Sequence, residues 1–126
     1  MADIVVTVPK SFTHRCAPGL KGLAAWVAEG DPAGEEWSGT EWEFYIGGSR
    51  PPVHAGDRVY IVCENRLRGY APLIRLDCID FRSWALVRGG DAMAVTINER
   101  MIGFRGWRYR WWSRESERPF PNWKAP

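Results

Sequence analysis

Residues 52–73 decide the fold, and they read Pro52-Val-His-Ala-Gly-Asp-Arg-Val-Tyr-Ile-Val-Cys-Glu-Asn-Arg-Leu-Arg-Gly-Tyr-Ala-Pro-Leu73. The β-branched run at 58–63 predicts a strand, residues 64–66 a tight reversal, and residues 67–79 a long return strand. Gly69 suits a bend in a curved sheet, whereas Pro72 lacks a backbone donor and predicts an edge position or a bulge. An antiparallel hairpin is therefore expected at the centre of the fold.

Shorter strands are predicted on both sides of this hairpin. Runs of β-branched and aromatic residues lie at 3–8, 41–46, 83–88, 92–97 and 104–112. Leu20, Leu23, Trp26 and Val27 recur at helical spacing and predict a helix over 18–28 that ends at Gly30. We expect an α+β, β-rich fold class: a small, partly open β-barrel with one or two helices.

The length and composition of the chain indicate one globular domain. Its 126 residues, 45% hydrophobic and 25% charged, fit a single unit, 1–126, with 113–126 packed back as a C-terminal tail. No apolar run is long enough to span a bilayer, and the amino end does not resemble a signal peptide. Cys16, Cys63 and Cys78 are odd in number and widely spaced, which favours reduced thiols in the cytoplasm.

Charge is unevenly distributed along the chain. The segment 29–43 has no Lys or Arg and holds Glu29, Asp31, Glu35, Glu36, Glu41 and Glu43. The segment 98–126 is basic and holds Arg100, Arg105, Arg108, Arg110, Arg114, Arg118 and Lys124 against three glutamates. This polarity indicates either a basic binding face with an acidic far side or two segments that neutralise each other.

The central hairpin resembles that of the PUA-like superfamily, which includes the PUA, ASCH and EVE domains. The resemblance rests on a Gly-Asp pair before an apolar strand, a tight turn and a glycine-containing return strand. Here these are Gly56, Asp57, residues 59–62 and residues 69–71. An early strand and a helix before this core also match the order of the superfamily, so the resemblance extends over residues 3–97.

The resemblance implies a PUA-like barrel and one of three roles: RNA binding in PUA domains, recognition of modified bases in EVE domains, or RNA-related and amidohydrolase roles in ASCH domains. The ASCH signature G-x-K-x-x-E-x-R is incomplete. Gly19 and Lys21 match it, whereas Ala24 and Trp26 replace its Glu and Arg. This departure weakens any transfer of ASCH catalytic chemistry to the chain.

The stretch 104–112, which reads Phe104-Arg-Gly-Trp-Arg-Tyr-Arg-Trp-Trp112, mixes arginines with aromatic residues. In a continuous strand, alternation places one set on each face: Arg105, Trp107, Tyr109 and Trp111 on one, and Phe104, Arg108, Arg110 and Trp112 on the other. Exposed rings would stack on bases while guanidinium groups meet phosphates. The alternative is that the rings fill the core and the arginines pair with the acidic segment 29–43.

Two further groups of residues are candidates for a ligand site. Arg66, Arg68 and Tyr70 follow a turn and would border the groove of the barrel, although Arg66 also fits a solvated hairpin. The passage from the first strand to the helix would form a pocket from Ser11, His14, Arg15, Lys21 and Trp26, and a helix starting near Gly19 would favour an anion there. His14 also fits an ordinary surface histidine.

Catalysis has weaker support in the sequence than binding. Lys21, with Glu43 or Glu64 as acid or base, could serve a hydrolase, but no local signature accompanies them. His14, Cys16, Cys63 and Cys78 lack the spacing of a metal site, so neither a metal nor a cofactor is expected.

Three functional hypotheses follow. The first is a binding module for RNA or a modified nucleobase, the second a small ASCH-type hydrolase or nuclease, and the third a protein-interaction module or inhibitor that uses its tryptophans. We expect a binding protein rather than an enzyme. Its partner would be a nucleic acid, with a protein partner as the alternative and no membrane, and the chain would be a monomer or weak dimer.

Overall fold

The predicted hairpin is the centre of the fold. The computed structural model describes residues 2–15, 17–30, 33–34 and 36–124. In it, β3 (Arg58–Cys63) and β4 (Arg66–Asp80) pair antiparallel around a two-residue turn. Glu64 and Asn65 both have positive φ, 53° and 61°, as in the type I′ turn whose twist matches that of the flanking strands. The hairpin is therefore confirmed, with strand bounds within one residue of those predicted.

A bulge near the start of β4 bends the strand. The register with β3 shifts between Ile61 and Val62, so Arg68 is an extra residue on β4. A Cβ at the neighbouring Gly69 would lie 2.3 Å from the Met93 carbonyl oxygen, so only glycine permits this close approach. β4 begins to pair with β5 at Leu73, after Pro72, so the hydrogen bonds between β4 and β5 do not require an N–H group from the proline.

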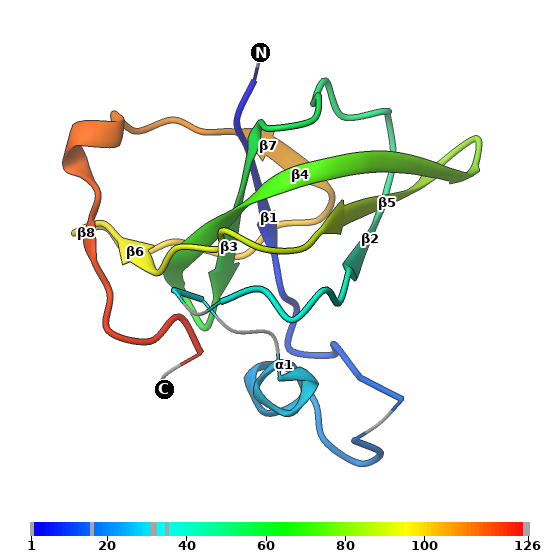
Figure 1. Ribbon diagram of the computed structural model, residues 1–126, viewed down its shortest axis with the longest axis horizontal. Coiled ribbons are helices and arrows are strands. Elements are labelled where there is room, and N and C mark those ends of the chain that lie inside the picture. Colours follow the sequence, from blue (N-terminus) through cyan, green and yellow to red (C-terminus); the bar gives the residue numbers. More distant parts are fainter. Residues whose placement is uncertain (1, 16, 31–32, 35, 125–126) are drawn as a thin grey trace.

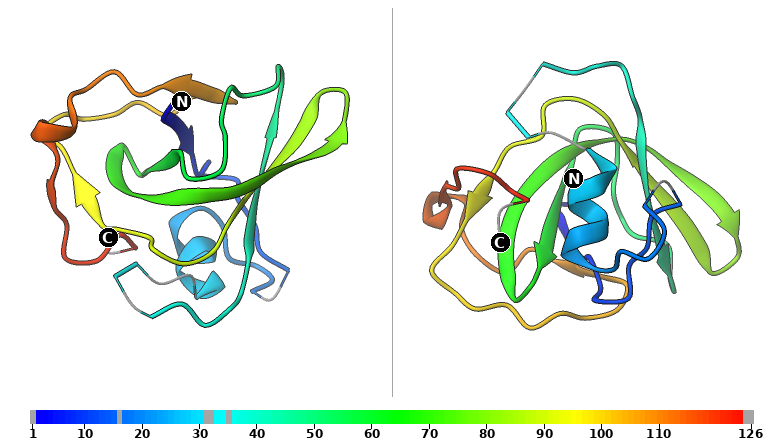
Figure 2. Two further views of the ribbon diagram at one scale, coloured as in Figure 1. Left: turned by 45° about the horizontal axis from the view of Figure 1, so that its top comes forward. Right: turned by 90° about the horizontal axis from the view of Figure 1, so that it is seen from below.

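The strands form a mixed, curled sheet with one helix at its end (Figures 1 and 2). The order in the six-stranded sheet is β2-β5-β4-β3-β1-β7, and β6 pairs with β8 in a separate ribbon. β1 runs parallel to β3, whereas the other paired strands are antiparallel. The remaining strands are β1 (Ile4–Thr7), β2 (Trp42–Gly47), β5 (Ser83–Arg88), β6 (Val95–Thr96), β7 (Trp107–Tyr109) and β8 (Arg118–Pro119).

The α+β, β-rich class is thus confirmed, and the sheet is not closed into a barrel. β2 and β7 are its outer strands, and they do not pair with each other. No helix in the described ranges is long and apolar enough to cross a bilayer.

Helix α1 (Leu23–Glu29) is shorter than predicted. Gly19 and Gly22 have φ of 89° and 62°, values outside the helical region, and they delay its start until Leu23. Its predicted end is confirmed, since Gly30 adopts the left-handed conformation and its N–H donates to the Val27 carbonyl.

The predicted strand at 104–112 is wrong in length, because only β7 pairs. Gly106 has a φ of 72°, which interrupts an extended chain just before Trp107. The predicted strand at 92–97 likewise reduces to β6 and an isolated bridge between Tyr70 and Met93. After β7 the chain forms the 3-10 helix η1 (Arg114–Ser116) and β8, and Phe120 and Trp123 in this tail are buried.

The sheet carries a hydrophobic cluster on each face. The interior cluster lies inside the curl and includes Ile4, Val6, Ile61, Leu86, Trp26 of α1 and Trp123 of the tail. The outer cluster lies on the other face, where residues of the segment 97–112 cover the strands; it includes Val5, Tyr60, Leu67, Met101 and Trp112. Trp112 meets Tyr60 edge to face, with ring centroids 5.2 Å apart.

Candidate functional site

A seam separates the two outer strands of the curled sheet. At one end the edges come close together: Trp107 Nε1 donates to the Ser49 carbonyl at 3.1 Å, and a Cβ at Gly106 would lie 3.5 Å from the Gly47 oxygen. Along the seam lies a cavity of about 560 Å³, which we call the seam cavity. Because the strands on either side do not pair, a ligand here meets side chains and free backbone edges rather than a continuous ladder.

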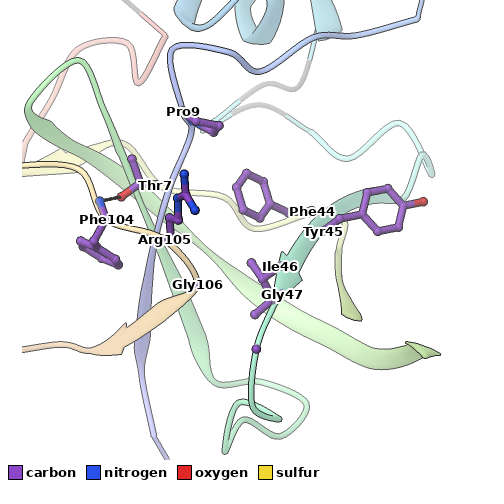
Figure 3. Close-up of a pocket in the computed structure, with 10 residues that line it drawn as sticks. Thr7, Pro9, Phe44, Tyr45, Ile46, Gly47, Phe104, Arg105 and Gly106 are labelled. Atoms are coloured by element: carbon purple, nitrogen blue, oxygen red, sulfur yellow. Dashed lines mark hydrogen bonds between the residues drawn. The ribbon is translucent and has the colours of Figure 1, made fainter. Parts of the chain in front are cut away.

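The seam cavity has an apolar wall and a wall that carries a cation (Figure 3). Phe44 and Ile46 of β2 form the first wall, and Pro9 and Arg105 lie opposite them, with the Arg105 side chain directed toward the same space as the Phe44 ring. Phe44 and Ile46 point inward because side chains alternate along β2, as its burial pattern shows. An aromatic face opposite a guanidinium group is the arrangement that binds flat, electron-rich rings.

The backbone of β2 also has free groups at the seam. The Gly48 N–H donates to the Arg82 carbonyl at 2.9 Å, so the N–H and C=O groups of every second residue, including Ile46, point toward β5. The alternate residues Tyr45 and Gly47 therefore direct theirs away from β5, toward the free edge. These groups add hydrogen-bond donors and acceptors to a largely apolar wall.

Arg105 is held in place by its neighbours rather than by an ion pair. The Phe104 N–H donates to Thr7 Oγ1 at 3.3 Å, which ties this segment to the end of β1. The Phe104 ring lies on the other side of the chain, 4.4 Å from the Arg108 guanidinium carbon. Within the described residues no carboxylate forms a salt bridge with Arg105, and its side chain is exposed. Its charge is therefore available to a ligand.

A second cavity adjoins the first at the end of the β3–β4 hairpin. This turn cavity measures about 260 Å³, and both cavities are lined by Thr7, Pro9, Phe104 and Arg105. Lys10, Glu64 and Asn65 line only the turn cavity. The Asn65 carbonyl accepts the Met101 N–H at 3.0 Å, which fixes the turn. The two cavities form one groove with Arg105 at the junction.

The residues of 104–112 that were predicted to bind nucleic acid have different surroundings in the structure. Arg105 lines both cavities, and Trp107 and Tyr109 lie beside the seam with their rings 5.1 Å apart. Tyr109 is 57% exposed. Arg108 is exposed over Phe104.

The rest of this set interacts with carboxylates. Trp111 Nε1 donates to Glu99 at 3.0 Å, and Arg110 Nε to Asp3 at 3.3 Å. Arg114 Nη2 also binds Asp3, at 2.7 Å. The expectation that the arginines of 104–112 pair with the acidic segment is therefore wrong for Arg110, whose partner is Asp3; Asp31 and Glu35 of that segment lie outside the described residues.

The expected rim of Arg66, Arg68 and Tyr70 does not border the groove. Arg68 is the bulge residue, only 2% exposed, and its Nε donates to the Cys63 carbonyl at 2.8 Å, so its predicted place on a rim is wrong. Burial lowers the pKa of its guanidinium group. Arg66 stacks on Phe120 at 4.1 Å, and Tyr70 lies against Tyr60 with the Arg58 guanidinium 4.1 Å from its ring.

The predicted pocket between the first strand and the helix is divided. Trp26 is 1% exposed and packs on Trp123 with ring centroids 5.3 Å apart, so it is a core residue rather than a pocket residue. His14 and Arg15 line a third cavity of about 510 Å³ together with Glu43. Ser11 and Lys21 are exposed. Because α1 begins at Leu23 rather than near Gly19, Lys21 precedes the helix, and anion binding at this position stays a prediction.

The catalytic candidates are not brought together. Glu43 lines the third cavity and accepts the Tyr45 hydroxyl, a hydrogen bond that raises the pKa of Tyr45. Glu64 lines the turn cavity, whereas Lys21 lines neither. No group of three or more His, Cys, Asp or Glu residues in the described part of the chain could hold a metal ion. A hydrolase built on these three residues therefore has no common site.

Sequence reasoning missed most of the groove. Phe44, Thr7 and Pro9 line it, but they lie in or next to the strands predicted at 41–46 and 3–8 and were not among the candidate site residues. Asn65 was part of a turn. Local patterns carry no signal for these roles, because the groove forms where two segments about 60 residues apart in the chain, β2 and 104–106, approach each other.

Comparison of the chain with protein-family models, with curated proteins and with solved structures finds no match, so the argument for function rests on the geometry of the groove.

Proposed function

We propose that the chain is a binding module for single-stranded nucleic acid, RNA or a strand with a modified base, and that it binds through the groove formed by the seam and turn cavities. The observation that carries the proposal is Arg105, an exposed cation without a salt bridge among the described residues, which lines both cavities and shares the seam cavity with the Phe44 ring. Stacking of a base on an aromatic ring contributes about 1–3 kcal/mol and tolerates any sequence.

The charges and rings around the groove support the same proposal. Lys10 and Arg105 line it, and Arg108 and Tyr109 are exposed on β7, the strand that follows Arg105 in the chain. Cations of this kind neutralise phosphates and release counterions, which makes affinity depend on salt. A strand whose bases are unpaired can place one base against Phe44 while its backbone follows the arginines; a duplex cannot, because its bases are stacked inside.

The proposal includes a PUA-like fold. Its support is the order of an early strand, a helix and a Gly-Asp strand, together with an incompletely closed sheet of short strands. The incomplete ASCH motif favours the binding members of that superfamily over the hydrolytic ones. A cytoplasmic, monomeric or weakly dimeric protein would fit this role.

Fluorescence anisotropy of labelled single-stranded RNA and DNA oligomers tests the proposal. We expect affinity to fall as salt rises, with log K linear in log salt and a slope of about −0.7 for each phosphate neutralised on a single strand. Arg105→Ala should weaken binding and reduce the magnitude of that slope by about 0.7, because one phosphate contact is lost.

Arg118→Ala is the matched control. Arg118 is exposed on β8, on the far side of the molecule from β2 (Figure 1), and its removal changes the net charge by the same amount. Its affinity and slope should match those of the wild type. Affinity that is independent of salt, or equal losses in the two variants, would contradict the proposal.

A protein partner is the second candidate, and the β4–β5 hairpin favours it. This hairpin extends beyond the rest of the sheet (Figures 1 and 2), and Phe81 at its tip is 84% exposed, with Ile79 half-exposed beside it. Exposed apolar groups of this kind are common at protein interfaces. If nucleic acid does not bind, Phe81→Ser provides the variant with which to test this alternative in pull-down experiments.

A further inference from the structure

The turn cavity is lined by a carboxylate residue and an amide residue, which the seam cavity lacks. Glu64 and Asn65 line it, and the side chain of neither forms a hydrogen bond or salt bridge with another residue in the described ranges. A carboxylate only accepts hydrogen bonds, whereas an amide both donates and accepts. Glu64 therefore offers two adjacent acceptor oxygens, and Asn65 beside it offers an NH₂ group with two donors and one acceptor oxygen.

The conformation of the turn keeps these groups where they are. Glu64 and Asn65 occupy the left-handed region, with φ of 53° and 61°. Asparagine tolerates this region well, whereas glutamate is unfavourable there and glycine would be favourable. A non-glycine residue in a strained turn position is a feature found at ligand sites. The Met101 N–H bond to the Asn65 carbonyl holds the turn against the segment 101–105.

Two cations share the cavity with the carboxylate. Lys10 and Arg105 both line it, so the cavity carries a net positive charge despite Glu64. This combination suits a ligand with an anionic group beside a ring that donates hydrogen bonds. A nucleotide has both parts, and its phosphate would lie at Arg105, at the junction of the two cavities.

Among the bases, guanine fits the turn cavity best. Its unpaired edge presents two adjacent donors, N1–H and N2–H, beside the O6 acceptor. The two Glu64 oxygens can accept both donors, and the Asn65 amide can donate to O6. Adenine, cytosine and uracil each lack the pair of adjacent donors, so they leave one carboxylate oxygen without a partner.

From this complementarity we infer that the turn cavity is a guanine-binding subsite read by Glu64 and Asn65. The inference rests on the proposed function where the guanine belongs to a nucleic-acid strand, with the neighbouring base against Phe44 in the seam cavity. A free guanine nucleotide presents the same edge and phosphate, and the experiment distinguishes the two sources.

The test uses three RNA hexamers and two free nucleotides. The hexamers are all-uridine, uridine with one guanosine, and uridine with one inosine, which is guanosine without the N2 amino group. We expect the guanosine hexamer to bind about tenfold more tightly than the other two, in line with one bidentate contact to a base edge. GMP and AMP are then added as competitors at equal concentration.

Glu64→Gln is the decisive variant, because it keeps the shape of the side chain and replaces one acceptor by a donor. It should reduce the guanosine preference, measured within this variant as the ratio of the affinities for the guanosine and all-uridine hexamers, from about tenfold to about onefold. Glu64→Gly provides a second variant that removes the carboxylate and relieves the turn strain, so it keeps the fold. Glu115→Gln removes one charge from η1 and should leave the preference unchanged.

The outcomes separate the subsite from the proposed function. Salt-dependent binding of all hexamers without a guanosine preference, or a preference that survives Glu64→Gln, overturns the guanine subsite and leaves the proposed function in place. GMP binding that requires Glu64, without binding of any hexamer, supports the subsite for a free nucleotide and overturns the proposed function. If neither hexamers nor GMP bind, both are wrong.

Discussion

The interior of the curled sheet and the seam at its edges use the same residue types in opposite ways. Trp26 and Trp123 pack against each other inside the sheet and are almost completely buried. Trp107 lies beside the seam, half-buried, and its indole N–H binds the Ser49 carbonyl. The difference lies in the strands around the rings. The inner strands of the sheet each pair with two neighbouring strands, whereas the outer strands β2 and β7 at the seam each pair with one.

A tryptophan-rich composition therefore does not by itself indicate a binding surface. The outer strands β2 and β7 lie on either side of the seam and do not pair with each other. Neither strand can move toward the other without breaking its hydrogen bonds to the strand that it already pairs with, so a ring between them stays accessible. Inside the curl the walls are joined by hydrogen bonds, and close packing excludes a ligand.

The largest expected effect distinguishes these two roles of tryptophan. Trp26→Ala should lower the free energy of unfolding by about 3–5 kcal/mol, because it opens a cavity where Trp123 packs. Trp107→Ala should cost about 1–2 kcal/mol, because its side chain is only half-buried. Urea unfolding followed by circular dichroism measures both.

The same two variants should rank in the opposite order in binding. In buffer without urea, at a temperature where both variants are folded, Trp107→Ala should weaken binding of an oligomer more than Trp26→Ala does. The reason is that only Trp107 lies beside the groove. Equal stability losses would show that the seam packs as tightly as the interior and would remove the basis of the comparison.

The sequence predicts the interior better than the seam for a physical reason. Hydrophobic alternation and a turn that requires positive φ are local properties, so they specify β3, β4 and their bounds. Gly106, by contrast, interrupts a stretch whose composition is typical of a strand, and the side chain of Arg68 is buried by a bulge that no composition rule predicts. Nor does any local pattern place Phe44 opposite Arg105, since that contact depends on how far the whole sheet curls.

A smaller effect concerns the anchoring of the seam edge. β7 is held on β1 by three residue pairs and, just beyond them, by Asp3, which binds Arg110 and Arg114 and whose carbonyl accepts the Arg110 N–H. Burial alone would raise the pKa of Asp3, but hydrogen bonds from the Arg114 side chain and the Arg58 N–H, together with the charges of Arg114 and Arg110, lower it below its usual value. Its carboxylate therefore contributes stability above about pH 4 and loses it as the pH falls through the folded-state pKa.

Asp3→Asn should reproduce this loss at neutral pH. The amide keeps an acceptor for the Arg58 N–H but removes the charge that attracts the arginines, which should cost about 1–3 kcal/mol. Hydrogen exchange should become faster in β7 and at the Arg110 amide just after it, while β3 exchanges as in the wild type. Acceleration spread evenly over β3 and β7 would contradict a separate, weaker seam edge.

The smallest expected effect is measured by cysteine alkylation, which leaves the fold intact and reports whether the interior of the sheet or only its seam edge opens. Cys63 of β3 belongs to the interior cluster, and burial raises the pKa of its thiol to about 11. Cys78 is exposed on β4, so it should react with iodoacetamide at pH 8, where only ~0.1% of Cys63 would be thiolate. Because Cys16 lies outside the described residues, the measurement uses a Cys16→Ser background and mass spectrometry of each peptide.

The rate of Cys63 alkylation then measures how often the interior opens. It should change in a variant of the interior and not in a variant of the seam edge. Trp26→Ala should raise it by the factor that corresponds to its loss of stability, about 100-fold or more, when reclosing is faster than alkylation. Asp3→Asn should leave it nearly unchanged if β7 opens without the interior. A large increase in Cys63 alkylation in Asp3→Asn would show instead that the seam edge and the interior open as one cooperative unit, and that the groove is as rigid as the core behind it.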